Sequence, residues 1–387
     1  MRVALICNTY IRNYGSILQS YATYNIIKSL GYDVDVVNYQ DIPRNIKTKL
    51  RISWHIRVPM LFHWKNIRKK ISSILISKNK EYLSIKSNRS NAMDRFVQEY
   101  FTFTPKANSI EDVKSIIAHY DGVVIGSDQL WGVAEIIRNY HTLSFVLDKQ
   151  PKIAYATSFG VSSLPSFLFK ESAKFLERIN QISVRENSGA EIVKDLIGRE
   201  VKVVADPTLL LSIQEWDAIS GQSRKIENPY IFCFFLGDNP NHRDFARKFK
   251  KETCLPIVYM QHLEEYIKID NVFADKCIND ASPADFINLI KNAEYVICDS
   301  FHASIFSIIF KKQFFTLNRY AMNTSNSRNT RIESLFSKLG LENRHIKGTE
   351  LISDLLKVST DYKSVHNIWR EWKNESIDFL KNALGIV

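Results

Sequence analysis

The sequence predicts an α/β protein with two parallel sheets. Short apolar runs rich in β-forming residues alternate with stretches whose apolar residues recur every three or four positions. This alternation runs through residues 1–205 and again through 206–360, so we expect two domains followed by a helical tail, 361–387, that packs on the body. A length of 387 residues is enough for two cores of ordinary size.

Composition excludes several classes of protein. A hydrophobic content of 45% and a charged content of 24% are typical of a soluble globular chain, and no apolar run is long enough to cross a bilayer. The start of the chain becomes polar after Cys7, too early for the core of a signal peptide. We therefore expect a cytoplasmic protein. The five cysteines lack metal-ligand spacing, so no metal site is predicted. Cys7, Cys233 and Cys298 lie in apolar strand-like runs and are interpreted as buried thiols.

The formal net charge of +11 indicates anionic partners: nucleic acid, a membrane surface or phosphorylated substrates. Basic residues concentrate in 44–89, where Glu81 is the single acid among interleaved aromatic and aliphatic residues. The commonest explanation of such a run is the solvated face of a helical insertion. Peripheral contact with the anionic inner face of a membrane is the next alternative. Nucleic acid is not expected as a partner, because no recognised nucleic-acid motif accompanies the charge.

The first polar loop follows an apolar strand at residues 2–7. Asn13, Tyr14 and Gly15 precede a helix pattern that carries Gln19 one turn later, and Gly31 ends that helix. These residues form either a polar rim that binds a hydroxyl-rich ligand or a glycine turn with solvated side chains.

Four further strands end in polar residues. Strands at 122–125, 152–160, 181–185 and 201–211, the last broken at Asp206 by Pro207, present Ser127, Asp128, Ser158, Arg185 and Asp206. Loops at one edge of a parallel sheet face the same way, so they should line one cleft. Arg185 is the candidate for binding an anion, because a guanidinium holds a carboxylate or phosphate with two hydrogen bonds. The alternatives are a structural ion pair for Arg185 and a helix cap for Asp128.

The central stretch of the second half runs from Tyr295 to Phe310. Its apolar period changes from that of a strand to that of a helix at Asp299, Ser300 and His302. Ser300 is placed to cap the helix, and His302 then lies in the first turn, beside backbone N–H groups that favour an anion. A histidine there can give a proton to a bound phosphate ester. The alternative is that the first two residues only cap and His302 only packs.

The polar loop after residue 318 contains Arg328, and Arg331 begins a helix that stops at Gly340. This loop is either mobile and solvated or a lid over an anion. Dinucleotide fingerprints, P-loops and the HExxH and GxSxG motifs do not occur.

Taken together, the strand ends resemble the polysaccharide pyruvyl transferase family from Arg2 to about Arg344, outside the basic segment. The resemblance lies in NYGSILQSYA, GSDQLW, ATSFG, SVRE, DPTLLL and SPADFINLIKNAEYVICDSFHASIFSIIF. It implies two Rossmann-like domains that face a cleft in the GT-B arrangement. It also implies transfer of a pyruvyl group from phosphoenolpyruvate to two hydroxyls of a sugar as a cyclic ketal, without metal or cofactor. Ala303 stands where the family more often has glycine.

The resemblance places the family's histidine on His302 and a donor-binding arginine on Arg185. The donor carries a carboxylate and a phosphate, for which Arg331, Arg328 and the turn from Asp299 to Ser300 are further candidate ligands. His302 is the expected general acid, and either Asp128 or Asp206 is expected to take the proton of the acceptor hydroxyl. The acceptor is expected in a cell-surface glycan or its lipid-linked precursor.

Two other functions remain open from the sequence. One is a GT-B glycosyltransferase that uses a nucleotide sugar, since a fold does not fix a function. The other is a protein without this activity: a binding or scaffold protein in glycan assembly that has lost it, or a basic nucleic-acid-binding module.

Overall fold

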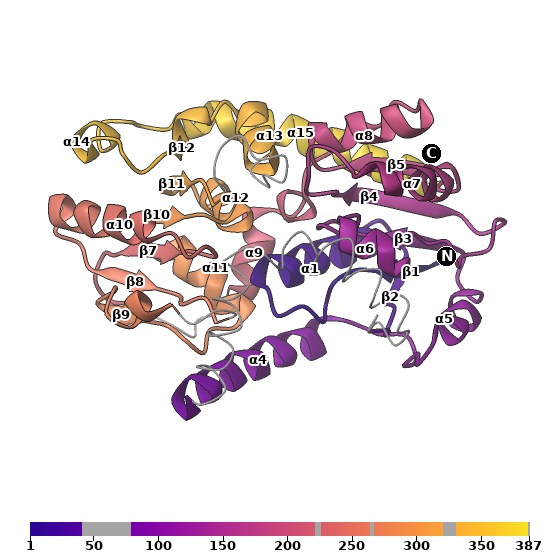
Figure 1. The fold of residues 1–387 in the computed structure, drawn as a ribbon, viewed down its shortest axis with the longest axis horizontal. Helices are drawn as coiled ribbons and strands as arrows, with labels where there is room; N and C mark the ends of the chain where they lie inside the picture. The colour runs from indigo at the N-terminus through magenta and orange to yellow at the C-terminus, as the bar shows by residue number, and fades with distance from the viewer. Residues whose placement is uncertain (41–78, 221–225, 264–266, 320–329, 386–387) are drawn as a thin grey trace.

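The computed structural model describes residues 1–40, 79–220, 226–263, 267–319 and 330–385. It contains two six-stranded sheets, and every strand pair in both sheets is parallel (Figure 1). The predicted α/β class with two sheets is confirmed. Most of the basic segment 44–89 lies outside the described residues, and its described end forms the start of a long helix.

The first sheet has the strand order β2-β1-β3-β4-β5-β6. Its strands are β1 (Arg2–Ile6), β2 (Asp33–Val36), β3 (Gly122–Ile125), β4 (Lys152–Thr157), β5 (Gln181–Val184) and β6 (Lys202–Val203). The central strand β3 is buried at all four positions, which explains why it is a continuous apolar run. The helices of this half are α1 (Tyr14–Ser29), α4 (Lys80–Tyr100), α5 (Ile110–Ile117), α6 (Val133–Arg138), η2 (Ser166–Leu168), α7 (Phe169–Glu177) and α8 (Asn187–Ile197).

The strand predicted over 201–211 is wrong for most of its length. Only Lys202–Val203 pair, and the chain then forms the 3₁₀ helix η3 (Pro207–Leu209). The physical reason is that Asp206 accepts a hydrogen bond from the amide of Thr208 as an N-cap, while Pro207 has no N–H to donate to a strand.

The second sheet has the order β12-β11-β10-β7-β8-β9. Its strands are β7 (Ile231–Phe234), β8 (Ile257–Tyr259), β9 (Lys276–Cys277), β10 (Tyr295–Cys298), β11 (Gln313–Leu317) and β12 (His345–Ile346). Its helices are α9 (Ile213–Ile219), α10 (Pro240–Thr253), η4 (Lys268–Asn271), α11 (Pro283–Asn292), α12 (Phe301–Ile309), α13 (Thr330–Leu339), η5 (Glu342–Arg344) and α14 (Ile352–Leu355).

The predicted start of α12 is confirmed. The Ser300 hydroxyl accepts a hydrogen bond from the amide of Ala303, and all nine residues of the helix are buried. A helix that is buried on every side is surrounded by protein, which fixes its position between the second sheet and the first half of the chain.

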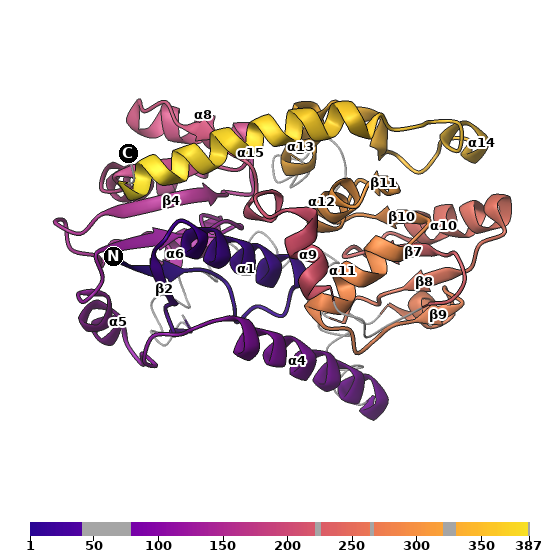
Figure 2. The same ribbon diagram turned by 180° about the vertical axis from the view of Figure 1, so that it is seen from behind.

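The C-terminal helix α15 (Tyr362–Leu384) leaves the second half and runs back across the first, as Figure 2 shows. The indole of Trp369 donates to the carbonyl of Leu209 at 2.8 Å, and the Ser376 hydroxyl accepts from the amide of Ala205 at 2.9 Å. No helix in the described part of the chain is long and apolar enough to cross a membrane.

Helix α1 joins the two halves at its N-terminus. The Tyr14 hydroxyl donates to the carbonyl of Ala281 at 2.8 Å, and the Tyr14 ring stacks on Phe286 with centroids 5.0 Å apart. A single apolar cluster includes residues of α1, α11, α12 and α15. We call this contact of α1 with α11 and α12 the domain seam. It brings polar residues that follow strands of both sheets next to one another.

Candidate active site

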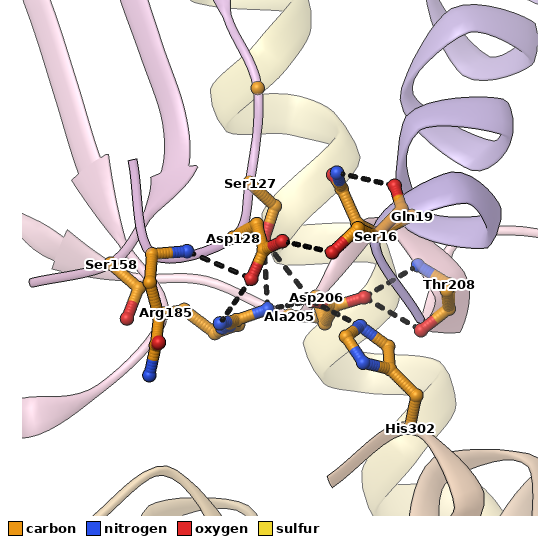
Figure 3. Close-up of polar contacts among 12 residues, drawn as sticks. Ser16, Gln19, Ser127, Asp128, Ser158, Arg185, Ala205, Asp206, Thr208 and His302 are labelled. Carbon is orange, nitrogen blue, oxygen red and sulfur yellow. Dashed lines mark hydrogen bonds and ion pairs between the residues drawn. The ribbon is translucent and has the colours of Figure 1, made fainter. Parts of the chain in front are cut away.

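Asp206, which follows β6, is the centre of the polar cluster at the seam (Figure 3). One carboxylate oxygen accepts from the amide of Thr208 at 3.0 Å and from its hydroxyl at 2.6 Å. The other accepts from Arg185 Nη1 at 2.7 Å and from the Ser127 hydroxyl at 3.1 Å. Burial by itself would raise the pKa of Asp206, but His302, Arg185 and Thr208 hold that pKa well below its usual range.

His302 enters this cluster from the other half of the chain. It lies in the first turn of α12, and its Nε2 is 3.7 Å from Asp206 Oδ2, beyond hydrogen-bond distance. Nε2 is buried and has no hydrogen-bond partner among the described residues. On the other side of the ring, a Cβ added to Gly15 would lie 2.0 Å from Nδ1. Residue 15 must therefore be glycine for the imidazole to occupy this position.

Arg185, at the end of β5, uses only part of its guanidinium within the protein. Nη1 binds Asp206 and the Ser127 hydroxyl, while Nε and Nη2 are buried and make no hydrogen bond to any described residue. Nη2 lies 3.8 Å from Asp128 Oδ1. Burial would lower the pKa of Arg185, but the surrounding carboxylates raise it, so this side chain is a fixed cation with two unused donors.

Arg331 brings a second guanidinium to the same place. It lies in the first turn of α13, and its central carbon is 5.5 Å from the centroid of the Phe301 ring, which Arg185 approaches to 4.7 Å. Its Nε is buried and has no partner among the described residues. Burial and the neighbouring Arg185 lower the pKa of Arg331 to about 10. The protein leaves this cation incompletely neutralised, and an anionic ligand would relieve that cost.

Asp128 forms the other acidic position. It follows β3 with a positive φ of 87°, which is strained for a residue other than glycine. Its carboxylate accepts from the Ser16 hydroxyl at 2.5 Å and from the amide of Gln129 at 2.8 Å. Burial would raise the pKa of Asp128, but Arg185, Ser16 and His302 lower it overall, so the group is a carboxylate at neutral pH.

The remaining predicted residues lie around this cluster and not in it. Asn13 caps α1, and Tyr14 joins the two halves. Gln19 donates to the carbonyl of Ser16 within its own helix, and its Oε1 is buried without a partner in the described chain. Ser158 donates to Glu186 at 2.8 Å.

The two residues that open the turn before α12 bind protein groups. Asp299 accepts hydrogen bonds from the amides of Leu236 and Gly237 at 2.6 and 2.9 Å, so it fixes the position of the loop after β7. Ser300 caps α12. Arg328 lies outside the described residues.

Sequence reasoning missed four contributors. The hydroxyl of Ser16 donates to Asp128, and the hydroxyl of Thr208 donates to Asp206. The ring of Phe301 lies against the guanidinium groups of Arg185 and Arg331. Glu186 accepts three hydrogen bonds through Oε1, while its Oε2 has no hydrogen-bond partner in the described chain. Ser16 lies three residues after the cap Asn13, in the first turn of α1, and that spacing was the available signal. Thr208 follows the capping residue Asp206 by two positions, so its signal was also local. No sequence signal marked Phe301 and Glu186, because their partners are distant along the chain.

No cluster of three or more histidine, cysteine or acidic side chains suited to a metal ion occurs in the described ranges. The site instead has two cations with unused donors, an imidazole with an unpaired nitrogen and two carboxylates. This combination can hold an anion and move protons.

Solved structures with similar folds cover nearly the whole chain. UDP-GlcNAc 2-epimerase from Neisseria meningitidis, bound to UDP-GlcNAc, has a TM-score of 0.52 and 10% identity over 99% of both chains. The Methanocaldococcus jannaschii UDP-GlcNAc 2-epimerase, in complex with UDP-GlcNAc and UDP, has a TM-score of 0.51 and 13% identity, over 97% of this chain and 100% of that one. The S. aureus MnaA complex with UDP has a TM-score of 0.53 and 11% identity, over 100% of this chain and 97% of that one. At these identities the likeness shows the fold alone.

The molecule is therefore a GT-B-like protein built from two Rossmann-like halves, as predicted. Its sequence matches the family described as polysaccharide pyruvyl transferase over residues 13–319, which is most of the chain, and the chain belongs to that family. No curated protein gives a significant sequence match.

Proposed function

We propose that the protein transfers a pyruvyl group from phosphoenolpyruvate to two hydroxyls of one sugar, in a cell-surface glycan or its lipid-linked precursor, and releases phosphate. One observation carries the proposal. Arg185, Arg331 and His302 all have buried nitrogen atoms that make no hydrogen bond to a described residue, and all three belong to one cluster. Buried donors of this kind are rarely left unused in a protein, so they favour a polar ligand.

The donor matches these groups in charge and in shape. Nε and Nη2 of Arg185 lie on one edge of a planar guanidinium and suit two oxygens of a carboxylate or phosphate. Arg331 supplies further positive charge, and the first turn of α12 adds N–H groups at the positive end of a helix. Two cations and a helix terminus are appropriate to a ligand that carries both a carboxylate and a phosphate.

His302 acts as the general acid in this proposal. Its protonated imidazole gives a proton to the methylene carbon of phosphoenolpyruvate, which becomes a methyl group and leaves an oxocarbenium-like centre at the neighbouring carbon. One sugar hydroxyl forms a C–O bond to that centre, and the second hydroxyl forms another as the C–O bond to phosphate breaks. One hydroxyl proton replaces the proton that His302 gave, and the other leaves on the phosphate.

The two carboxylates that sequence reasoning left as alternatives for the base differ in their surroundings, which supports giving them different roles. Asp206 is 1% exposed and accepts four hydrogen bonds, and its strongly lowered pKa makes it a poor proton acceptor. Its position favours orienting His302 and stabilising the imidazolium. Asp128 has fewer protein donors and a more exposed side chain, so we assign it the hydroxyl proton that then leaves on the phosphate.

The test is to incubate the protein with phosphoenolpyruvate and neutral sugars that offer neighbouring hydroxyl pairs. Release of inorganic phosphate, together with an acceptor whose mass increases by one pyruvyl ketal, is the expected result. Consumption of a nucleotide sugar with release of a nucleoside diphosphate, and no phosphate from phosphoenolpyruvate, would instead identify a GT-B glycosyltransferase.

A further inference from the structure

A second site lies away from the His302 cluster, on the side of the molecule where α4 runs beneath α1 and the second half of the chain (Figure 1). There a cavity of about 470 Å³ separates α4 from the start of α11. This volume falls in the range of about 300–1,000 Å³ that is usual for small-molecule sites. The cavity is lined by Asn88, Asn91, Ala92, Arg95, Phe96, Glu99 and Tyr100 of α4 and by Asp280, Ser282, Ala284 and Asp285.

Helical periodicity explains why polar side chains meet at this cavity. The lining residues of α4 recur at intervals of three or four, so they form one stripe along the helix. The residues Asn88, Asn91 and Arg95 are exposed to solvent, and their side chains make no hydrogen bond or ion pair with another described residue. At the inner edge of the stripe Phe96 packs on Tyr100, with ring centroids 4.5 Å apart. The cavity therefore offers amide and guanidinium groups beside an aromatic surface.

Buried contacts of α4 and α1 with the second half of the chain hold the walls of the cavity in a fixed relation. Arg89 of α4 donates to the carbonyls of Gln261 at 2.5 Å and Asn279 at 2.9 Å, and its guanidinium lies 5.9 Å from the centroid of the Tyr14 ring. The Tyr14 hydroxyl binds the carbonyl of Ala281, which is next to the lining residue Ser282. Gly15, the residue after Tyr14, contacts His302. The cavity thus borders the same seam that contains the candidate active site.

The chemistry of the lining selects a class of ligand. Asparagine amides and an arginine each present paired hydrogen-bonding atoms that match neighbouring hydroxyls, and an aromatic ring matches the apolar face of a sugar. Arg95 and Glu99, the two charged residues of α4 in the lining, are opposite in sign, so this face of α4 does not favour an acidic ligand. The acidic residues at the cavity are not arranged as metal ligands, since the described residues contain no set of three or more histidine, cysteine or acidic side chains that could hold a metal ion.

We propose that this cavity binds a neutral oligosaccharide and holds the part of the acceptor glycan that lies beyond the sugar being modified. The second half of this statement rests on the proposed function. A site on the seam but outside the reaction centre gives the enzyme a means of selecting acceptors by chain length without altering the catalytic groups.

The experiment measures binding of neutral tetrasaccharides of glucose, galactose, mannose and N-acetylglucosamine to the full chain, without phosphoenolpyruvate, by calorimetry and saturation-transfer NMR. We expect at least one to bind, and the double variant Asn91→Ala/Arg95→Ala to weaken that binding by about tenfold or more, because several direct hydrogen bonds are lost. The matched control is Ser87→Ala/Lys86→Ala, which removes a polar group and a positive charge from α4 outside the lining and should bind as the wild type does.

Absence of binding by every tetrasaccharide, equal binding by the Asn91→Ala/Arg95→Ala variant, or tighter binding of an acidic oligosaccharide would overturn the assignment. The two proposals fail separately. If the wild-type protein binds no oligosaccharide but releases phosphate from phosphoenolpyruvate, the result counts against this cavity alone. If it binds an oligosaccharide but releases no phosphate, the result counts against the transfer reaction.

Discussion

Two buried arginine–aspartate pairs in this molecule look alike but differ in what they leave unused. Arg243 of α10 binds Asp270 through Nε at 2.9 Å and Nη2 at 3.2 Å, and its Nη1 donates to the carbonyl of Gly237 at 2.7 Å. Arg185 binds Asp206 at 2.7 Å through Nη1, while its Nε and Nη2 make no hydrogen bond to any described residue. Both arginines are almost fully buried.

The comparison shows that burial and ion pairing do not by themselves mark a functional site. The Arg243 pair satisfies each of its donor nitrogens, which is the pattern of a structural element. The Arg185 pair leaves donors buried beside a second cation and an unpaired imidazole nitrogen, which is costly unless a ligand completes the hydrogen bonds. The following experiments test that distinction.

The largest effect is expected from His302→Ala. Removal of the general acid should lower the rate of phosphate release by about 10²–10⁴-fold. Binding of phosphoenolpyruvate and the thermal unfolding temperature should change little, because the imidazole is not hydrogen-bonded to Asp206. Steady-state kinetics and calorimetry measure these quantities. The exposed His119→Ala is the control, and near-normal turnover in His302→Ala would refute the role of this residue.

The second largest loss in the rate of phosphate release is expected from Gly15→Ala. The new methyl group would lie 2.0 Å from Nδ1 of His302, so the ring must turn or the two halves must separate. Displacement of a catalytic group by about 1 Å costs roughly 10²-fold in rate. Gly122→Ala is the matched control, because its Cβ would have an ordinary contact of 3.7 Å with Pro151. A rate for Gly15→Ala equal to that of the control would show that close contact at the seam is not required.

The paired variants Arg185→Lys and Arg243→Lys test the comparison directly. Lysine keeps the charge but loses the second and third donor positions. At 185 we expect the KM for phosphoenolpyruvate to rise at least about tenfold with little change in stability, since a hydrogen bond to a charged group contributes about 1.5–3 kcal/mol. At 243 we expect a lower unfolding temperature and an unchanged KM. If both variants behave alike, the unused donors of Arg185 carry no special meaning.

The smallest effect concerns pH. The pKa of Asp206 is lower in the folded protein, so its contribution to stability is present above the unfolded value of about 3.9 and is lost as the pH falls below it. Asp206→Asn removes this dependence. Below pH ~4, urea unfolding of the variant should lose stability less steeply than the wild type, by up to about 1.4 kcal/mol per pH unit. Parallel curves would show that the carboxylate is not held ionised by its neighbours.

Local sequence determined much of the fold. The strand Tyr295–Cys298 and the helix Tyr362–Leu384 follow directly from apolar periodicity, and the caps at Ser109, Ser282 and Ser300 follow from short-range hydrogen bonding. The short strand at Lys202–Val203 was overestimated because neighbouring apolar residues enter a 3₁₀ helix and not the sheet.

For the site, the sequence by itself predicted polar residues at strand ends, because a strand end in a parallel sheet is recognisable from local pattern. Three of the predicted residues, Arg185, Asp206 and His302, lie in one cluster in the structure. Only the tertiary structure decided how they are used. Asp299 turns to the loop after β7, Tyr14 joins the two halves, and Ser16 reaches Asp128 across 112 positions of sequence. A side chain's partner depends on which distant elements pack beside it, and that information becomes available only when both sheets and the helices between them have assembled.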